Sequence, residues 1–215
     1  MSDSTLAVTE RVVRTIADVA LENEFYFAEL DGVVGDGDFG LSLANGFRKL
    51  IDEWDTLDRS SPGVFLKKVS MIITSRVGGV SGAIWGTGFM RAGFAAGDKA
   101  ELTADDVIAM LRAAEEGMKK RGQSDQGDKT LLDGFIPAVD ELERVLKSGG
   151  STQEALNAAA VKAREQTEVM KPWIAKRGRA AYTGERSMDT YDAGSIAVAV
   201  MAERIAASWP EILTP

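Results

Sequence analysis

Apolar residues recur at steps of three and four along most of the chain, which is the spacing that places them on one face of an α-helix. Within residues 6–30, for example, Val8, Val12 and Ile16 follow this spacing. No convincing alternation of apolar and polar residues, the pattern of a half-buried strand, is found. The pattern therefore predicts an all-α protein with eight helices, which we expect at 6–30, 40–55, 63–77, 82–96, 103–120, 128–147, 151–169 and 193–208.

Residues typical of helix starts support several of these segments. Ser61 precedes Pro62, and proline is well tolerated in a first helical turn. Ser151 and Glu154 have the spacing of a capping box, in which each residue bonds the backbone of the other. Asp128 is a further candidate N-cap, for the helix expected at 128–147.

The connections between the predicted helices are mostly short, so sequential helices should run antiparallel within one domain of residues 1–215. One long irregular segment, at about 171–193, is rich in Gly, Arg, Tyr, Thr and Ser. Segments of this length without regular structure are more often functional lids than linkers. We therefore expect a flexible lid there.

Composition excludes several classes of function. The 215-residue chain has a formal net charge of −8, which argues against binding to nucleic acid or to an anionic membrane. It has neither histidine nor cysteine, so disulfides, thiol nucleophiles and Ser-His-Asp triads are excluded and a metal would have to be held by oxygen atoms. No secretion signal and no apolar run near the ~20 residues of a membrane span are visible, so a cytoplasmic protein is expected.

Three aspartates, Asp31, Asp36 and Asp38, lie within eight residues on a glycine-rich stretch. Carboxylates this close repel one another unless a cation neutralises them, and Mg²⁺ commonly takes one or two carboxylates together with phosphate oxygens. Residues 35–40 also match Gly-x-Gly-x-x-Gly, but a helical segment rather than a strand precedes them, which argues against a dinucleotide fold. An ordinary turn that caps the next helix remains the structural alternative.

Two further segments suggest contacts with phosphate. In the glycine cluster at 76–88, Val80, Ser81 and Gly82 fall near a predicted helix N-terminus, where free N–H groups favour an anion. Close helix packing is the alternative interpretation of these glycines. Residues 176–186 carry four positive charges in an acidic protein, which predicts either a phosphate clamp on the lid or a solvated basic loop.

Taken together, these motifs resemble the L subunit of dihydroxyacetone kinase, the nucleotide-binding half of that enzyme. The resemblance covers nearly the whole chain and rests on the order and spacing of five motifs. They lie at residues 35–40, 77–82, 127–130, 177–187 and 192–194.

The resemblance implies an all-α, single-domain barrel of eight antiparallel helices with the nucleotide among the loops at one end. It assigns two Mg²⁺ ions to Asp31, Asp36 and Asp38, ADP or ATP as the nucleotide, and a catalytic role to Arg179. The residues that match its nucleotide contacts are Phe39, Gly40, Leu41, Ser42, Val80, Ser81, Gly122, Leu131, Arg179, Asp192, Ala193 and Gly194.

The resemblance also implies partners. In this family a separate K subunit holds the ketose through a histidine, and some L subunits are recharged by a phosphocarrier of the phosphotransferase system. Phe39 stands where the recharged subunits usually carry histidine, which favours exchangeable ATP, and Ala193 stands where proline is usual. In-place rephosphorylation of ADP, erythrulose as the ketose and a homodimer remain open. A regulatory nucleotide-binding protein and a helical scaffold without ligand are the rival functions.

Overall fold

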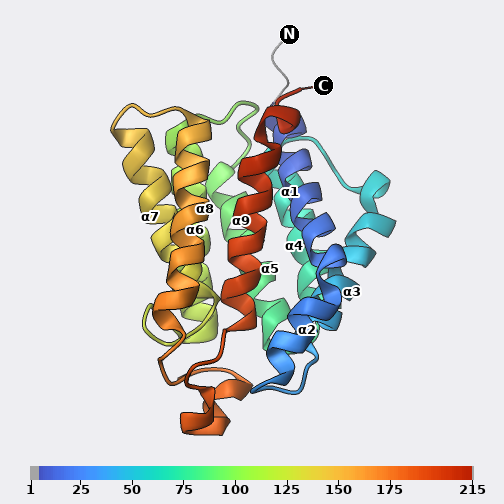
Figure 1. Cartoon of the computed structure of the whole chain (residues 1–215). Helices are drawn as coiled ribbons and strands as arrows, with labels where there is room; N and C mark the ends of the chain where they lie inside the picture. Colours follow the sequence, from blue (N-terminus) through green and yellow to red (C-terminus); the bar gives the residue numbers. More distant parts are fainter. Residues whose placement is uncertain (1–4, 215) are drawn as a thin grey trace.

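The computed structural model describes residues 5–214 and contains nine α-helices, two 3₁₀ helices and no strand within that range (Figure 1). The prediction of an all-α fold is therefore confirmed. The α-helices are α1 Thr5–Glu22, α2 Glu24–Gly32, α3 Phe39–Asp52, α4 Pro62–Arg76, α5 Gly79–Ala96, α6 Ala104–Gly122, α7 Leu131–Lys147, α8 Thr152–Met170 and α9 Ala193–Ile212; the 3₁₀ helices are η1 Trp54–Thr56 and η2 Arg179–Ser187.

Eight of the helices form a closed ring. From α3 to α9 each helix packs against the next one along the chain, and α1 completes the circuit by contacting both α3 and α9. Figure 1 shows them running alternately between two ends, with the start of α1 and the end of α9 at one end and the 33–38, 123–130 and 171–192 connections at the other. We call this second end the loop end.

The predicted count of eight α-helices is wrong by one, because the segment expected at 6–30 forms both α1 and α2. The break lies at Asn23, whose backbone is not helical and whose side-chain amide donates to the Val19 carbonyl oxygen at 2.9 Å. Asparagine competes in this way for nearby backbone groups, which makes it a poor residue for a helix interior. The extra helix, α2, leads the chain to the loop end.

Local caps explain where several helices begin. Ser61 caps α4, and Ser151 with Glu154 forms the predicted capping box of α8. The prediction that Asp128 caps α7 is wrong, since Thr130 is the N-cap and Asp133 completes a capping box. Lys129 has a left-handed backbone (φ 60°), so the chain cannot be helical as early as Asp128.

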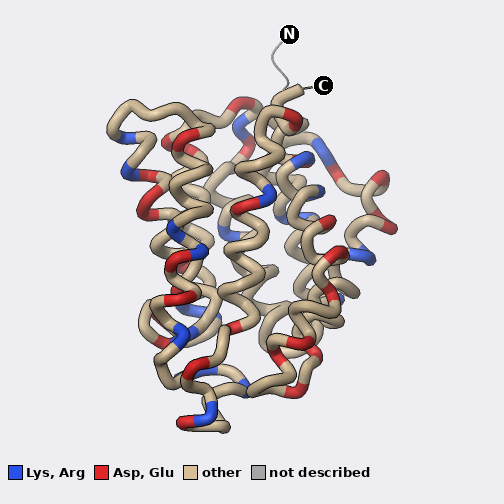
Figure 2. The backbone as a smooth tube through the Cα atoms, viewed as in Figure 1, with Lys and Arg blue, Asp and Glu red and all other residues tan. Residues whose placement is uncertain are grey.

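The inside of the ring is filled by apolar side chains, including the fully buried Phe27, Phe47 and Phe65. Buried charged residues are few among the described residues, namely Glu115, Lys129 and Asp133. Figure 2 shows that charged positions are spread along the helices and also occur at the loop end. No helix among the described residues is long and apolar enough to cross a membrane. The segment expected to form the lid contains η2, so part of it has regular structure, and its flexibility stays a prediction.

Candidate functional site

The three aspartates predicted to bind metal lie together at the loop end. Asp31 is in the last turn of α2, and Asp36 and Asp38 are in the connection to α3. One carboxylate oxygen from each residue lies within 4.8 Å of the others. Asp31 is partly buried, whereas Asp36 and Asp38 are exposed. The cluster offers hard oxygen ligands of the kind that Mg²⁺ takes.

Packing of α3 against α2 brings these aspartates together. Gly40 permits this packing, since a Cβ atom there would collide with the carbonyl oxygen of Glu24. Gly37 turns the chain with a φ of 74°, and the Phe39 N–H donates to Asp31 Oδ2 at 3.3 Å. The glycines of this stretch therefore serve close approach and a tight turn.

Arg179, the first residue of η2, reaches this cluster from the lid. Its Nη1 lies 2.9 Å from Asp38 Oδ2 and also pairs with Asp36. The hydrogen bond to Asp38 and the neighbouring Asp36 raise the pKa of the guanidinium. Partial burial raises the pKa of Asp31, against the bond from the Phe39 N–H, and the charges of Asp36 and Asp38 raise it further. These carboxylates thus attract a cation.

The predicted phosphate contacts lie at two adjacent helix starts. Phe39, Gly40, Leu41 and Ser42 form the first turn of α3, and Asp38 occupies its N-cap position without a side-chain cap bond. The Ser42 N–H already donates to the Asp38 carbonyl oxygen at 2.9 Å, but the N–H groups of Gly40 and Leu41 have no intrahelical acceptor, so they can bind an anion. The Phe39 ring itself is buried against Phe27, which leaves its backbone as the group that faces the loop end.

Val80 and Ser81 are in the first turn of α5, which begins three residues earlier than predicted. A Cβ atom on Gly78, the N-cap of α5, would lie 2.9 Å from Ser42 Oγ. The N-termini of α3 and α5 therefore meet side by side. Both direct backbone N–H groups toward the loop end.

The remaining predicted contacts lie at the ends of α6, α7 and α9. Gly122 ends α6, and a Cβ atom there would lie 3.3 Å from Ile84 Cδ1 of α5. Leu131 begins α7, and its Cβ atom would lie 3.1 Å from a Cβ atom on Gly194. Ala193 and Gly194 form the first turn of α9. These residues therefore line the same end of the barrel as the aspartates.

Asp192 caps α9 by accepting a hydrogen bond of 2.6 Å from the Ser195 N–H. Burial raises the pKa of Asp192 to about 7, with a further upward contribution from the charge of Asp133. A carboxyl group of this kind is sensitive to any cation placed nearby, because it carries a full negative charge only above neutral pH.

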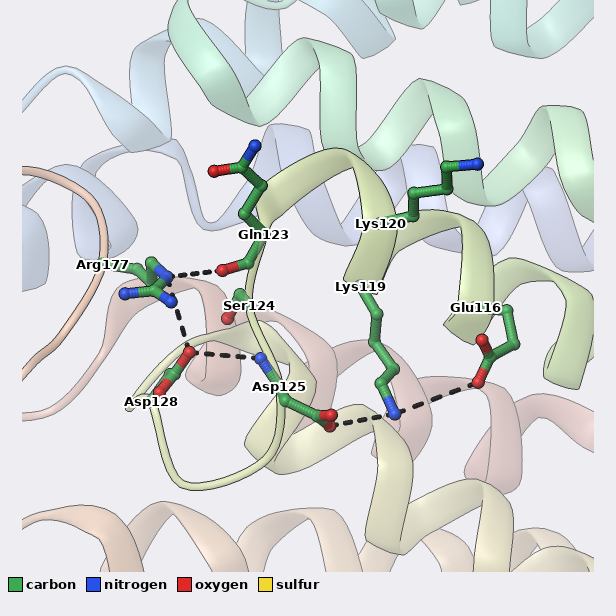
Figure 3. Close-up of a pocket in the computed structure, with 8 residues that line it drawn as sticks. All are labelled: Glu116, Lys119, Lys120, Gln123, Ser124, Asp125, Asp128 and Arg177. Atoms are coloured by element: carbon green, nitrogen blue, oxygen red, sulfur yellow. Dashed lines mark hydrogen bonds and ion pairs between the residues drawn. The ribbon is translucent and has the colours of Figure 1, made fainter.

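The lid contacts both sides of the loop end through two arginines that are two residues apart. Arg179 contacts the aspartates, whereas Arg177 Nε donates to the Gln123 carbonyl at 2.6 Å and lies 3.5 Å from Asp128 Oδ2. Figure 3 shows these Arg177 contacts at the edge of a surface hollow of about 560 Å³. The hollow adjoins Gly122 but does not include the aspartates; it is lined by Glu116, Lys119, Lys120, Gln123, Ser124, Asp125, Asp128 and Arg177.

Three buried polar residues at the loop end were not predicted: Lys129, Asp133 and Ser187. Asp133 accepts hydrogen bonds from the N–H groups of Gly127 and Thr130, and so shapes the turn before α7. The Thr130-x-x-Asp133 spacing could have identified it as a capping box. Lys129 donates to distant carbonyl groups and Ser187 Oγ accepts from the distant Ala175 N–H, and the local sequence gives no signal for either contact.

Known proteins are similar to this chain in both sequence and fold. The DAK2 domain family matches residues 33–207. The ADP-binding subunit of a PEP-dependent dihydroxyacetone kinase from Escherichia coli is 33% identical over 88% of this chain and 90% of its own length. The ADP-binding subunit of PEP-dependent dihydroxyacetone kinase 2 from Listeria innocua is 35% identical over 79% of each chain.

The crystal structure of the dihydroxyacetone kinase of C. freundii superimposes with a TM-score of 0.74 at 24% identity, covering 94% of this chain. This chain spans only 34% of that longer one. At this level of identity the likeness concerns the fold. The sequence matches over most of the chain carry the assignment, and the chain belongs to the DAK2 domain family.

Proposed function

We propose that this chain is the nucleotide-binding subunit of a short-ketose kinase, in which a phosphoryl group passes from Mg²⁺-bound nucleotide to a ketose held by a separate K subunit. The observation that carries the proposal is the cluster of Asp31, Asp36 and Asp38 facing the lid arginine, Arg179, at the loop end. Relatives named as ADP-binding subunits of dihydroxyacetone kinases, which match this chain over most of their length, support it.

The aspartates would hold the metal. All three offer carboxylate oxygens, and their separation of at most 4.8 Å suits one or two ions shared among them; we propose two. Bound Mg²⁺ would neutralise the phosphate oxygens of the nucleotide. Two of the three acids are exposed and can exchange Arg179 for another cation, since an exposed pair of this kind contributes only about 0–1 kcal/mol.

The other residues at the loop end would bind and orient the nucleotide. First-turn N–H groups of α3 and α5, at Gly40 and Leu41 and at Val80 and Ser81, would donate to phosphate, and Ser42 would contribute its hydroxyl group. Arg179 would place its guanidinium against the charge that develops on the transferred group. Gly122, Leu131 and the start of α9, which lie at the same end of the barrel, would contact the rest of the nucleotide.

For the phosphoryl donor we propose exchangeable ATP. The Phe39 side chain is 9% exposed and packs on Phe27, so it belongs to the core and presents no ionisable group to the loop end. In-place rephosphorylation of ADP by a phosphocarrier is the alternative. It predicts that ADP stays bound through gel filtration, whereas the ATP proposal predicts that it is lost.

The central experiment is calorimetric titration with ADP and ATP in the presence of Mg²⁺. Alanine at Asp36 or Asp38 should weaken nucleotide binding by about 100-fold or more. Removing a residue that binds the metal should cost at least as much as removing a residue that only orients a metal-binding side chain. Asp125→Ala is the matched control, since Asp125 is an exposed loop aspartate outside the cluster. Equal affinity in all four proteins, with unchanged helical content, would refute the proposed metal site.

Reconstitution with a K subunit, ATP and either dihydroxyacetone or erythrulose then tests the reaction and identifies the ketose. Phosphorylated ketose that appears only when both subunits are present supports the kinase. Nucleotide binding without any turnover would favour the regulatory alternative. Sedimentation of the purified chain tests the expectation of a homodimer.

A further inference from the structure

Lys129 is a buried lysine next to the lid. The residue is only 3% exposed. Among the described residues, no carboxylate pairs with its ammonium group. Burial lowers its pKa, and the nearest acidic charges, Asp192 and Asp189, only partly oppose this. A buried ammonium group without an ion-pair partner must be stabilised by hydrogen bonds instead.

Three backbone carbonyls supply these bonds, and all three belong to the segment 171–187. Lys129 Nζ donates to Lys171 O at 2.7 Å, to Trp173 O at 2.9 Å and to Ser187 O at 2.6 Å. An ammonium group has three N–H donors, so its capacity is fully used. The first two carbonyls lie before η2 and the third lies at its end, so one side chain ties together both ends of the lid.

Neighbouring contacts hold the same base of the lid. Ser187 Oγ accepts from the Ala175 N–H at 2.9 Å and donates to the Gly184 carbonyl at 2.6 Å. The Lys176 N–H donates to Asp128 O at 3.0 Å, one residue before Lys129. The lid is thus joined to the 123–130 connection on one side, while Arg179 joins it to the aspartates on the other.

The backbone of Lys129 itself is in the left-handed region, with a φ of 60°. A residue with a β-carbon adopts this conformation only when its surroundings enforce it, and such residues concentrate at functional sites. Here the conformation accompanies a side chain directed at the lid rather than at solvent. A glycine would permit this backbone more easily but could not supply the ammonium group.

We infer that Lys129 is a positioning residue, which fixes the base of the lid so that Arg179 stays over the aspartate cluster. Its effect on the nucleotide rests on the proposed function; its effect on the lid does not. The two effects can therefore be tested separately, with Lys129→Met as the main variant. Methionine keeps an apolar stem of similar length but leaves the three carbonyls without a donor.

The first test is digestion of the full-length protein with an arginine-specific protease, which cuts after Arg177, Arg179 and Arg186 and is indifferent to the loss of a lysine. Lid cleavage in Lys129→Met should be about tenfold faster than in the wild type, because the lid opens more often. Lys129→Gln, with two donors, should fall between them. Lys162→Met, on the exposed face of α8, is the control and should match the wild type.

Circular dichroism and urea unfolding show whether each variant is folded before digestion. A lid cut no faster in folded Lys129→Met than in the wild type overturns the inference. If the methionine variant does not fold, the glutamine variant decides in the same way. If neither folds, Lys129 is required by the whole barrel rather than by the lid, and the inference is also overturned.

The second test is the dissociation rate of ADP with Mg²⁺, followed by displacement with excess unlabelled nucleotide. Lys129→Met should release ADP about tenfold faster while the Mg²⁺ dependence stays that of the wild type, because the aspartates are unchanged. An unchanged rate in a protein whose lid is cut faster would refute the link between lid and nucleotide. If the wild type binds no ADP, the proposed function fails, and the digestion still decides whether Lys129 anchors the lid.

Discussion

Two loops of this protein both carry aspartates but use their carboxylates in opposite ways. The acid loop, residues 31–38, has three aspartates and three glycines, and the cap loop, residues 123–130, has two aspartates and one glycine; each leads into a helix N-terminus at the loop end. The sequence predicts a metal site in the acid loop and a helix cap, Asp128, in the cap loop. The structure separates them by the partners of each acidic side chain.

The cap loop uses its acids to organise its own chain and the lid. Asp125 accepts a 2.8 Å hydrogen bond from the Gln126 N–H and pairs with Lys119. Asp128 accepts from the Asp125 N–H and lies near the lid residue Arg177. Asp133, just beyond the loop, completes the capping box of α7. Each carboxylate thus has a structural role.

The acid loop leaves its acids accessible to an external cation. Asp38 stands at the N-cap of α3 but makes no side-chain cap bond, and Asp36 pairs with Arg179, which comes from the lid. Asp31 accepts a 3.3 Å bond from the Phe39 N–H. A carboxylate at a helix start is therefore informative about function when it does not perform the capping that its position allows.

Removal of an acidic side chain next to the cap loop should therefore destabilise the protein, whereas removal of one in the acid loop should not. We expect Asp133→Ala to lower the free energy of unfolding by about 3 kcal/mol, because Asp133 is fully buried and its loss leaves two partly buried N–H groups unsatisfied. Asp38→Ala should change it by less than about 1 kcal/mol, since only an exposed ion pair is lost. Urea unfolding measures both; equal losses would contradict the distinction.

The acid loop should instead be sensitive to the packing that positions it. Gly40→Ala should cost about 2 kcal/mol, within the usual range for overpacking, because the new methyl group would collide with the α2 backbone. Gly122→Ala, before the cap loop, should cost less than about 1 kcal/mol, because the tip of the flexible Ile84 side chain can move. Thermal unfolding compares the two variants, and a larger loss at Gly122 would show that α2 and α3 are loosely packed.

The smallest expected effect is a difference in pH dependence between the two loops. Burial raises the folded-state pKa of Asp31, so the folded state binds the extra proton and stability falls as pH rises from the unfolded value of about 3.8 through the folded value. The bond from Gln126 lowers the pKa of Asp125, so its contribution is present above about 3.8 and is lost as pH falls through the folded value.

Asp31→Asn and Asp125→Asn should therefore each remove one contribution to the pH dependence of the free energy of unfolding, and the two contributions should have opposite signs. Urea unfolding between pH 3 and pH 6, with chelator present, measures them. Because Asp125 is exposed, its change should be the smaller of the two. Changes of the same sign would show that the two carboxylates do not have different environments.

Local sequence patterns determined most of the helices of this protein. Seven of the eight segments predicted from apolar spacing each correspond to one α-helix. The capping box of Ser151 and Glu154 also forms as expected. These features depend on residues within one or two turns of each other, so they can be recognised without knowledge of the fold. The same holds for the grouping of Asp31, Asp36 and Asp38, which lie on one short connection.

The tertiary structure alone decided which groups meet across the loop end. Arg179 pairs with an aspartate 143 residues earlier, and Lys129 bonds carbonyls 42 to 58 residues later. The choice of Thr130 over Asp128 as the cap of α7 follows from the turn that Lys129 adopts. Contacts of this range exist only once the helical ring has closed, because closure is what brings distant connections to one end of the barrel.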